Sequence, residues 1–161
     1  ELLLPIGTIR VFTDQSRCFV NLQRHTPTAT TSHFNQALNS QMPGISVRDD
    51  LYAFDRTTNE LLWKRSVPNR RILQFPDCNL PFLVMMSHVK DRVNNSLESL
   101  AIEVIDSQSG MTIGYRENLT YDRQLLTAHY DGERGQIRIR GLTSDIELRF
   151  GPAVGQTQAV R

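Results

Sequence analysis

The chain has 161 residues, of which 39% are hydrophobic and 22% are charged, so it is neither disordered by composition nor too short for one folded domain. Lys and Arg number 18 against 17 Asp and Glu, and this net charge of +1 leaves no basic excess for binding nucleic acid. A membrane span is excluded because the most apolar stretch, 80–89, is interrupted by Pro81, Ser87 and His88.

Short alternating or apolar runs separated by turn residues predict an all-β chain, since no long segment has apolar residues at helical spacing. The predicted strands are 8–12, 17–22, 46–55, 60–66, 71–75, 82–89, 100–106, 111–117, 125–130, 136–140 and 145–150. In 136–140 two isoleucines alternate with polar residues, which predicts a half-buried strand. The first part of 82–89 is apolar throughout, as expected for a strand covered on both faces.

Aspartate residues mark the predicted turns in a repeating order. One kind of turn simply separates two strands and is marked by Asp14, Asp77 and Asp131. The other is a five-residue connection that begins at Asp55 or Asp106 and ends at Asn59 or Gly110. Four strands with two such turns would form one antiparallel β-propeller blade. We therefore predict one all-β segment over 1–150, with about three blades at 8–66, 70–117 and 125–150, and a flexible tail at 151–161. The alternative is a β-sandwich.

The most informative stretch is 53–63, Ala-Phe-Asp-Arg-Thr-Thr-Asn-Glu-Leu-Leu-Trp. It resembles the tryptophan-docking repeat of the pyrroloquinoline-quinone-type propellers, Ala-x-Asp-x-x-Thr-Gly-x-x-x-Trp. The matching residues are Ala53, Asp55, Thr58 and Trp63, with Asn59 in place of Gly. Asp and Thr are expected to hold the turn, and Trp to lie flat between neighbouring blades. A weaker copy at 104–114 contains Asp106 and Gly110 but has Gly where Trp belongs, so its docking contact is expected to be lost.

In this family the same blade serves quinone-dependent dehydrogenases and non-catalytic scaffolds, such as an outer-membrane assembly lipoprotein with a propeller body. The catalytic branch, as the resemblance implies, needs a central cofactor with calcium, a catalytic Asp, a stacking Trp and often a vicinal disulfide. The chain has no Cys-Cys pair, and its single Trp is assigned to docking. We therefore expect a non-enzymatic, quinoprotein-like protein without cofactor. The resemblance also implies an extracytoplasmic location, in the periplasm or cell envelope.

Other candidate chemistry is weak. The four histidines, His25, His33, His88 and His129, have no metal-type spacing, so no metal site is predicted, although a zinc site from His25 and His33 remains an alternative. Cys18 and Cys78 are interpreted as small buried residues, with a single disulfide left open.

Two insertions, 25–44 and 90–99, fall between the second and third strands of their blades and are expected to emerge from one rim. The first is longer than the roughly 12–15 residues above which loops are usually functional or disordered. We predict a binding surface there, although a disordered or self-packed loop is the alternative. Its residues would be Thr26, Thr28, Thr31, Ser32, His33, Phe34, Asn35, Val93, Asn94 and Asn95.

The expected function is a non-enzymatic protein-binding or scaffolding module. Because about three blades are fewer than the ~4–8 of a closed ring, exposed sheet edges would recruit a protein partner or the remaining part of a longer chain. One alternative is a part of a larger quinone-dependent oxidoreductase. The other is a self-associating structural unit, a homo-oligomer that closes a ring by pairing its edges.

Overall fold

The structure, a computed structural model, describes residues 5–25, 44–75, 78, 80–90, 98–120, 125–141 and 145–150. All regular secondary structure in these ranges is β-strand, which confirms the all-β prediction. The strands are β1 (Ile6–Thr13), β2 (Arg17–Arg24), β3 (Gly44–Asp55), β4 (Leu61–Leu73), β5 (Phe82–Lys90), β6 (Glu98–Asp106), β7 (Thr112–Thr120), β8 (Leu125–Asp131), β9 (Gln136–Gly141) and β10 (Asp145–Arg149). Over the same ranges, no helix has the length and apolar character that crossing a lipid bilayer requires.

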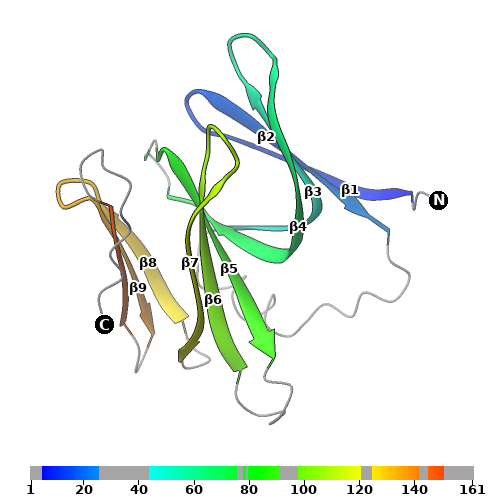
Figure 1. Ribbon diagram of the computed structural model, residues 1–161. Helices are drawn as coiled ribbons and strands as arrows, with labels where there is room; N and C mark the ends of the chain where they lie inside the picture. Colours follow the sequence, from blue (N-terminus) through cyan, green and yellow to red (C-terminus); the bar gives the residue numbers. More distant parts are fainter. Residues whose placement is uncertain are drawn as a thin grey trace.

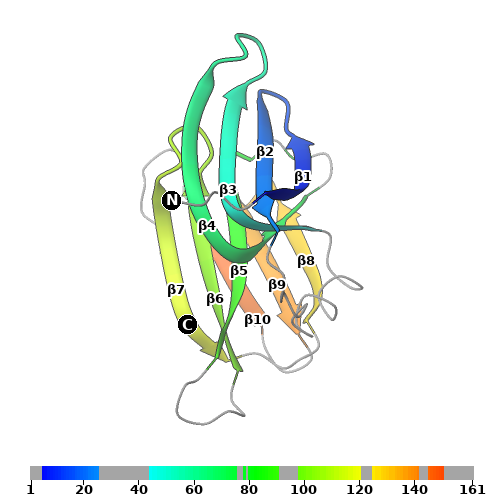
Figure 2. The same ribbon diagram turned by 90° about the vertical axis from the view of Figure 1, so that its right-hand side faces the viewer.

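The strands form two antiparallel sheets, a seven-stranded meander of β1 to β7 and a three-stranded sheet of β8 to β10. The larger sheet bends along β4, which pairs with β3 over most of its length but with β5 only at Arg71 and Ile72. The chain therefore builds three layers (Figures 1 and 2). We call β1 to β3 with residues 61–67 the first layer, residues 70–73 with β5 to β7 the second layer, and β8 to β10 the third layer.

The break predicted between strands 60–66 and 71–75 is wrong, because both belong to β4. Pro68 and the following Asn indicate a turn in the sequence, but here they lie in a bulge of a continuous strand. Val47 pairs with Arg70 and Asp49 pairs with Val67, so β4 has one residue more than β3 in this interval. Bulges bend a strand and tolerate a proline that cannot donate to the ladder. The first two predicted blades consequently form one seven-stranded sheet instead of two sheets of four strands, whereas 125–150 forms a separate sheet of the three strands predicted there.

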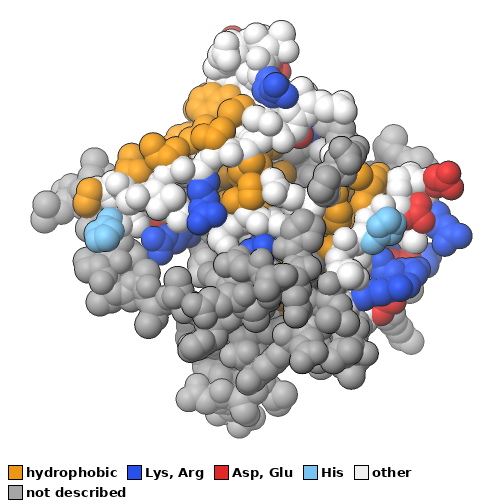
Figure 3. Space-filling view, turned by 180° about the vertical axis from the view of Figure 1, so that it is seen from behind, with side chains coloured by type: hydrophobic (Ala, Val, Ile, Leu, Met, Phe, Trp, Pro, Cys, Tyr) orange, Lys and Arg blue, Asp and Glu red, His pale blue; other side chains and the backbone are white. Residues whose placement is uncertain are grey.

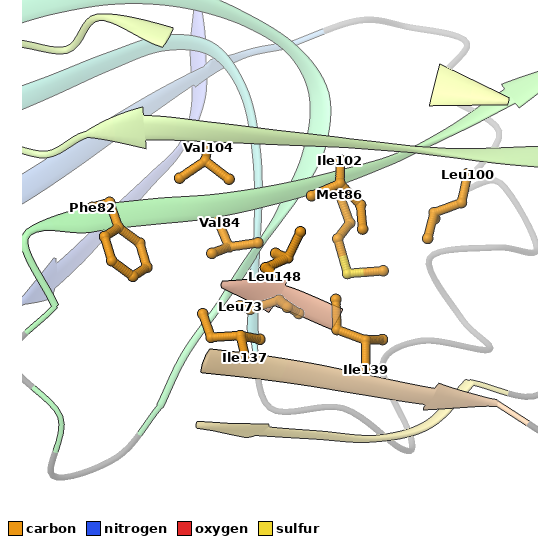
Figure 4. Close-up of a cluster of buried hydrophobic side chains, with 10 residues drawn as sticks. All are labelled: Leu73, Phe82, Val84, Met86, Leu100, Ile102, Val104, Ile137, Ile139 and Leu148. Carbon is orange, nitrogen blue, oxygen red and sulfur yellow. The ribbon is translucent and has the colours of Figure 1, made fainter. Parts of the chain in front are cut away.

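Two clusters of buried side chains hold the layers together. One lies between the first and second layers and includes Phe19, Leu51 and Trp63. The other lies between the second and third layers, where side chains of β5 and β6 point toward those of β9 and β10 (Figure 4). Its buried members are Leu73, Phe82, Val84, Met86, Leu100, Ile102, Val104, Ile137, Ile139 and Leu148.

Strands β5 and β9 follow the patterns that the sequence predicts. In β5, Val84 contributes to one cluster and Met85 to the other, which confirms that this strand is covered on both faces. In β9, Ile137 and Ile139 are fully buried while the alternate residues face away from the core, which confirms a half-buried strand. Cys18 and Cys78 are free thiols and only half-buried, so the prediction that both are buried is wrong.

Candidate functional site

The binding surface predicted on the two insertions lies outside the described residues. The positions concerned are Thr26, Thr28, Thr31, Ser32, His33, Phe34, Asn35, Val93, Asn94 and Asn95. That surface therefore stays a prediction. All residues of the docking repeat, in contrast, are described.

Asp55 and Asp106 hold two turns with the same hydrogen-bond pattern. The Asp55 carboxylate accepts the backbone N–H groups two and three residues later at 2.7 and 2.9 Å. Asp106 accepts the equivalent groups at 3.1 and 2.7 Å. The turns end at Asn59 and Gly110, with φ of 60° and 71°. The backbone bonds, that of Thr58 first, hold the pKa of Asp55 below its ordinary value of 3.8.

Trp63 connects the first layer to the turn of the second. Its indole Nε1 donates to the Ser107 carbonyl oxygen at 3.0 Å, and the ring lies against Gly110. A Cβ on Gly110 would be 2.7 Å from the indole Cδ2, which is too short for a non-bonded contact. The ring therefore requires glycine at this position, and the positive φ also favours it. The fold thus brings together residues that the sequence assigns to two successive repeats.

Ser107 is the centre of this junction and is fully buried. Its N–H donates to the Pro81 carbonyl at 3.0 Å, and its hydroxyl accepts from the guanidinium of Arg17. Arg17 is also buried, donates to the Leu80 carbonyl at 3.3 Å and pairs with Asp14 at 2.8 Å. One guanidinium thus links the β1–β2 turn, the start of β5 and the β6–β7 turn. Sequence reasoning missed Arg17 because arginine is seldom buried without a specific partner.

Asp131 begins a third turn of the same kind as those at Asp55 and Asp106. Its carboxylate accepts the N–H three residues later at 3.1 Å, and the turn ends at Gly135 with φ of 57°. The Asp14 carboxylate accepts backbone N–H groups in the same way, but its connection has only three residues and does not end at a residue with positive φ, so the prediction that groups Asp131 with Asp14 is wrong. In this third turn the Phe150 carbonyl oxygen, rather than an indole, occupies the space over the glycine, 2.7 Å from the place of a Cβ.

The first layer carries apolar side chains on its outer face, the face directed away from the second layer. These residues are Ile9, Val11, Val20, Leu22, Tyr52 and Phe54. Ile9 and Val11 are 60% and 61% exposed, and the other four are half-buried. Figure 3 shows a band of hydrophobic side chains over this part of the molecule.

The outer face is continuous because directly opposed residues of antiparallel strands share a face. Val11 opposes Val20, and Val20 opposes Tyr52. Lys64 follows on β4, with its Nζ 5.2 Å from the centroid of the Tyr52 ring and 3.6 Å from an Asp50 carboxylate oxygen. Contacts with Tyr52 first, and with Asp50 next, raise the pKa of Lys64 above its ordinary value of 10.5. An apolar centre with a paired charged margin is the usual composition of a protein interface.

The third layer has a different face at the other end of the stack. Its side chains directed away from the core are mostly charged, and Arg138 pairs with Glu147 at 3.7 Å. Arg140 pairs with Asp145 at 3.8 Å on the next row. A polar outer face is what a solvent-exposed terminal layer of a stacked fold requires. The stack therefore has one polar end and one apolar end.

A cavity of about 580 Å³ lies between the first and second layers. Its apolar lining includes Phe12, Phe19 and Phe82, and its volume falls within the roughly 300–1,000 Å³ of small-molecule sites. The charged side chains at its margin already have partners, since Arg56 donates to the Asp14 carbonyl oxygen at 2.8 Å and the Asp14 carboxylate binds a buried arginine. The two charged side chains of the cavity lining, Asp14 and Arg56, therefore both bind groups of the β1–β2 connection.

The sequence contains a signal for the outer face that our prediction did not use. Strand β2 has apolar residues at both alternating positions, with Phe19 on one face and Cys18, Val20 and Leu22 on the other. A strand with this pattern is expected to be covered on both faces.

In the described part of the chain, no group of three or more His, Cys, Asp or Glu side chains is placed to hold a metal ion.

Comparison of the chain with models of protein families, with curated proteins and with solved structures finds no match. The likeness to the quinone-type propeller repeat therefore rests on the residues of this chain alone.

Proposed function

We propose that the protein is a non-enzymatic binding or scaffolding module built from quinoprotein-like propeller blades, and that its outer face docks a β-sheet of a protein partner. The observation that carries this is the contrast between the apolar, exposed end of the stack and its charged end. Ile9 and Val11 stand in the exposed part of a continuous apolar face. Contiguous apolar surface on a folded chain marks an interaction site.

The second layer indicates what kind of structure fits such a face. When the sequences are aligned at Asp55 and Asp106, Phe54 of the outer face corresponds to Ile105. Ile105 is fully buried in the cluster that the second layer forms with the first. Because the equivalent face of the second layer is covered by a sheet, a sheet is the occupant that the outer face favours.

The propeller architecture is supported by the order of the layers and by the contact of Trp63 with the next turn. Each layer packs on its neighbour through apolar side chains, as blades do around a propeller axis. The shared strand β4 departs from separate four-stranded blades, since it belongs to both the first and the second layer.

Asn59 limits what the partner presents. It occupies the position in the first-layer turn that Gly110 occupies in the second, and both have a positive φ. A Cβ at Gly110 would be 2.7 Å from the indole of Trp63, so a residue with a Cβ leaves no room for a ring in that place. The partner sheet is therefore expected to dock without an indole over this turn.

The insertions at 26–35 and 93–95 form a second contact region in this proposal, and the extracytoplasmic location belongs to it through the family resemblance. Deletion of 26–41 should leave the folded core intact and weaken partner binding. Circular dichroism checks the first expectation, and titration with the partner identified below checks the second. Unchanged affinity would remove residues 26–35 from the binding surface.

The docking face is tested by placing a photo-crosslinking amino acid at Val11 in the full-length protein, in the cells that produce it. We expect one discrete cross-linked protein, with the linked peptide in a β-strand of that partner. Thr8 is the matched control, because it is exposed on the same strand at a position of the opposite face. With the purified partner, Val11→Lys should weaken binding by about tenfold or more, and Thr8→Lys should have little effect.

Equal cross-linking from Val11 and Thr8, or none from Val11, would overturn the docking face. If Val11 cross-links only to a second copy of the chain, the outer face mediates self-association instead of binding another protein. Sedimentation velocity would then check the oligomeric state.

A further inference from the structure

A groove of about 200 Å³ crosses the charged face of the third layer, at the opposite end of the stack from the outer face. Figure 3 shows basic side chains, His and acidic side chains next to one another over this part of the molecule. The groove is lined by Thr127, His129, Asp131, Arg134, Gln136, Arg138 and Arg140. The lining has three guanidinium groups, and each lies 3.7 or 3.8 Å from one carboxylate: Arg134 from Asp131, Arg138 from Glu147 and Arg140 from Asp145.

Arg138 is central in this groove, because it stands on the middle strand of the sheet, β9, directly opposite His129. Thr127 is opposite Arg140 in the same register. The hydroxyl and the imidazole therefore stand beside the guanidinium groups, and both side chains can donate a hydrogen bond. Asp131, the single carboxylate of the lining, already accepts the backbone N–H of Arg134.

The guanidinium groups keep hydrogen-bond donors that their acidic neighbours do not use. Arg138 is 3.7 Å from Glu147 and Arg140 is 3.8 Å from Asp145, whereas a charge-assisted N–H···O bond is about 2.7–2.9 Å long. Glu147 bonds first to Arg149, and this bond holds the pKa of its carboxyl below the ordinary value of 4.5. The Nε of Arg138 is buried and finds no hydrogen-bond partner among the described residues.

The Arg138 side chain is 34% exposed although its Nε is buried, so its terminal Nη groups are the donors that a ligand in the groove can reach. We infer that the groove binds a small dianionic oxyanion, a phosphate group of free phosphate or of a small phosphomonoester, with Arg138 as its central ligand. Arg134 and Arg140 flank it. The planar guanidinium fork matches a phosphate in geometry, and a phosphate in the groove would compete with Glu147 and Asp145 for the guanidinium groups. This site is independent of the outer face and of its partner.

Titration of the full chain with inorganic phosphate at low ionic strength, followed by amide NMR shifts, tests the inference. We expect saturable shifts centred on β8 and β9. Arg138→Gln should reduce the affinity by about tenfold or more, because it removes a charged donor group. Arg10→Gln is the control for net charge, since Arg10 is an exposed arginine of β1. This variant should bind phosphate like the wild type.

Two further variants separate a ligand role from a structural one. Glu147→Gln should strengthen phosphate binding severalfold, because it releases Arg138 from its acidic neighbour, an effect that a merely structural arginine would not produce. If Arg138→Gln does not fold, Arg138→Lys keeps the charge but loses the fork, and it should still weaken binding.

The choice of titrant identifies the source of the phosphate group. Tighter binding of glycerol phosphate than of inorganic phosphate would assign the site to a phosphomonoester, and the reverse order would assign it to free phosphate. The site would be overturned if chloride at equal ionic strength caused the same shifts as phosphate. It would also be overturned if the Arg138→Gln and Arg10→Gln variants bound phosphate with equal affinity. Either result would explain the shifts by charge screening alone.

Discussion

The indole of Trp63 lies against Gly110, so the last residue of one docking repeat rests on the glycine of the next. The Nε1–H of the same ring bonds to Ser107 in that turn at 3.0 Å. Since Trp63 belongs to the first layer and Gly110 to the second, this contact fixes how the two layers meet across the bend in β4.

Gly110→Ala should destabilise the fold by about 2–4 kcal/mol, since the new Cβ opposes both the left-handed backbone and the ring. Asn59→Ala is the matched control, because Asn59 has nearly the same φ in the turn of the first layer, whereas the Trp63 ring lies against the turn of the second layer. It should cost only the backbone part, about 1 kcal/mol. Urea unfolding measures both free energies.

The coupling between the two residues is measured by a double-mutant cycle. In a Trp63→Leu background, Gly110→Ala should lose the part of its cost that comes from the ring, which leaves a coupling energy of about 1 kcal/mol or more. Additive effects would show that the ring and the glycine do not constrain one another.

Arg17→Ala should destabilise the fold by about 2–4 kcal/mol, because it removes the ion pair of the half-buried Asp14 carboxylate and leaves the buried Ser107 hydroxyl without its partner. Arg24→Ala is the comparison, since Arg24 forms a more exposed ion pair with Asp50. That change should cost less than about 1 kcal/mol. Thermal and urea unfolding of the two variants give the difference, and similar losses would contradict the role of Arg17 as the link between turns.

Asp106 should make the fold more stable above about pH 4 than below it. Burial raises the pKa of its carboxyl, but bonds from the Ser109 hydroxyl and from the N–H groups of Ser109 and Gln108 outweigh this, so the pKa lies below its ordinary value of 3.8. A depressed pKa in the folded state stabilises above the unfolded pKa, and the effect is lost as the pH falls through the folded pKa.

The Asp106→Asn variant cannot titrate at this position, so its deficit against the wild type should shrink as the pH falls below about 4. Urea midpoints at a series of pH values measure this. A deficit that stays constant down to acid pH would mean that the carboxylate charge does not stabilise the turn.

The strands were predictable because their signal is local. Alternation in β9 and a fully apolar β5 each follow from a few adjacent residues, and so does the acceptor role of Asp55 in its turn. The continuity of β4 was not predictable from the same signals. Pro68 and Asn69 have the composition of a turn, and only the pairing of β4 with β3 makes them a bulge.

The outer face and Arg17 depend on contacts between distant segments. Val20 and Leu22 look like core residues in any strand pattern, and nothing local tells which face the rest of the chain leaves open. Arg17 is buried because Ser107 and Leu80 reach it from other strands. Tertiary contacts of this kind are outside what periodicity and turn chemistry report.

Asp49 provides the last prediction, since it lies at the bulge that bends the first layer toward the second. Its φ is 64°, and its carboxylate accepts the backbone N–H of Arg24 at 2.8 Å. Asp49→Ala loses this hydrogen bond and places alanine, which disfavours a left-handed backbone, at this position. The free energy of unfolding should therefore fall by about 1–3 kcal/mol. Asp49→Asn keeps both the acceptor oxygen and the tolerance, and should change stability by less than about 0.5 kcal/mol. Urea unfolding separates the two, because equal losses would assign the effect to the charge of Asp49 rather than to the bulge.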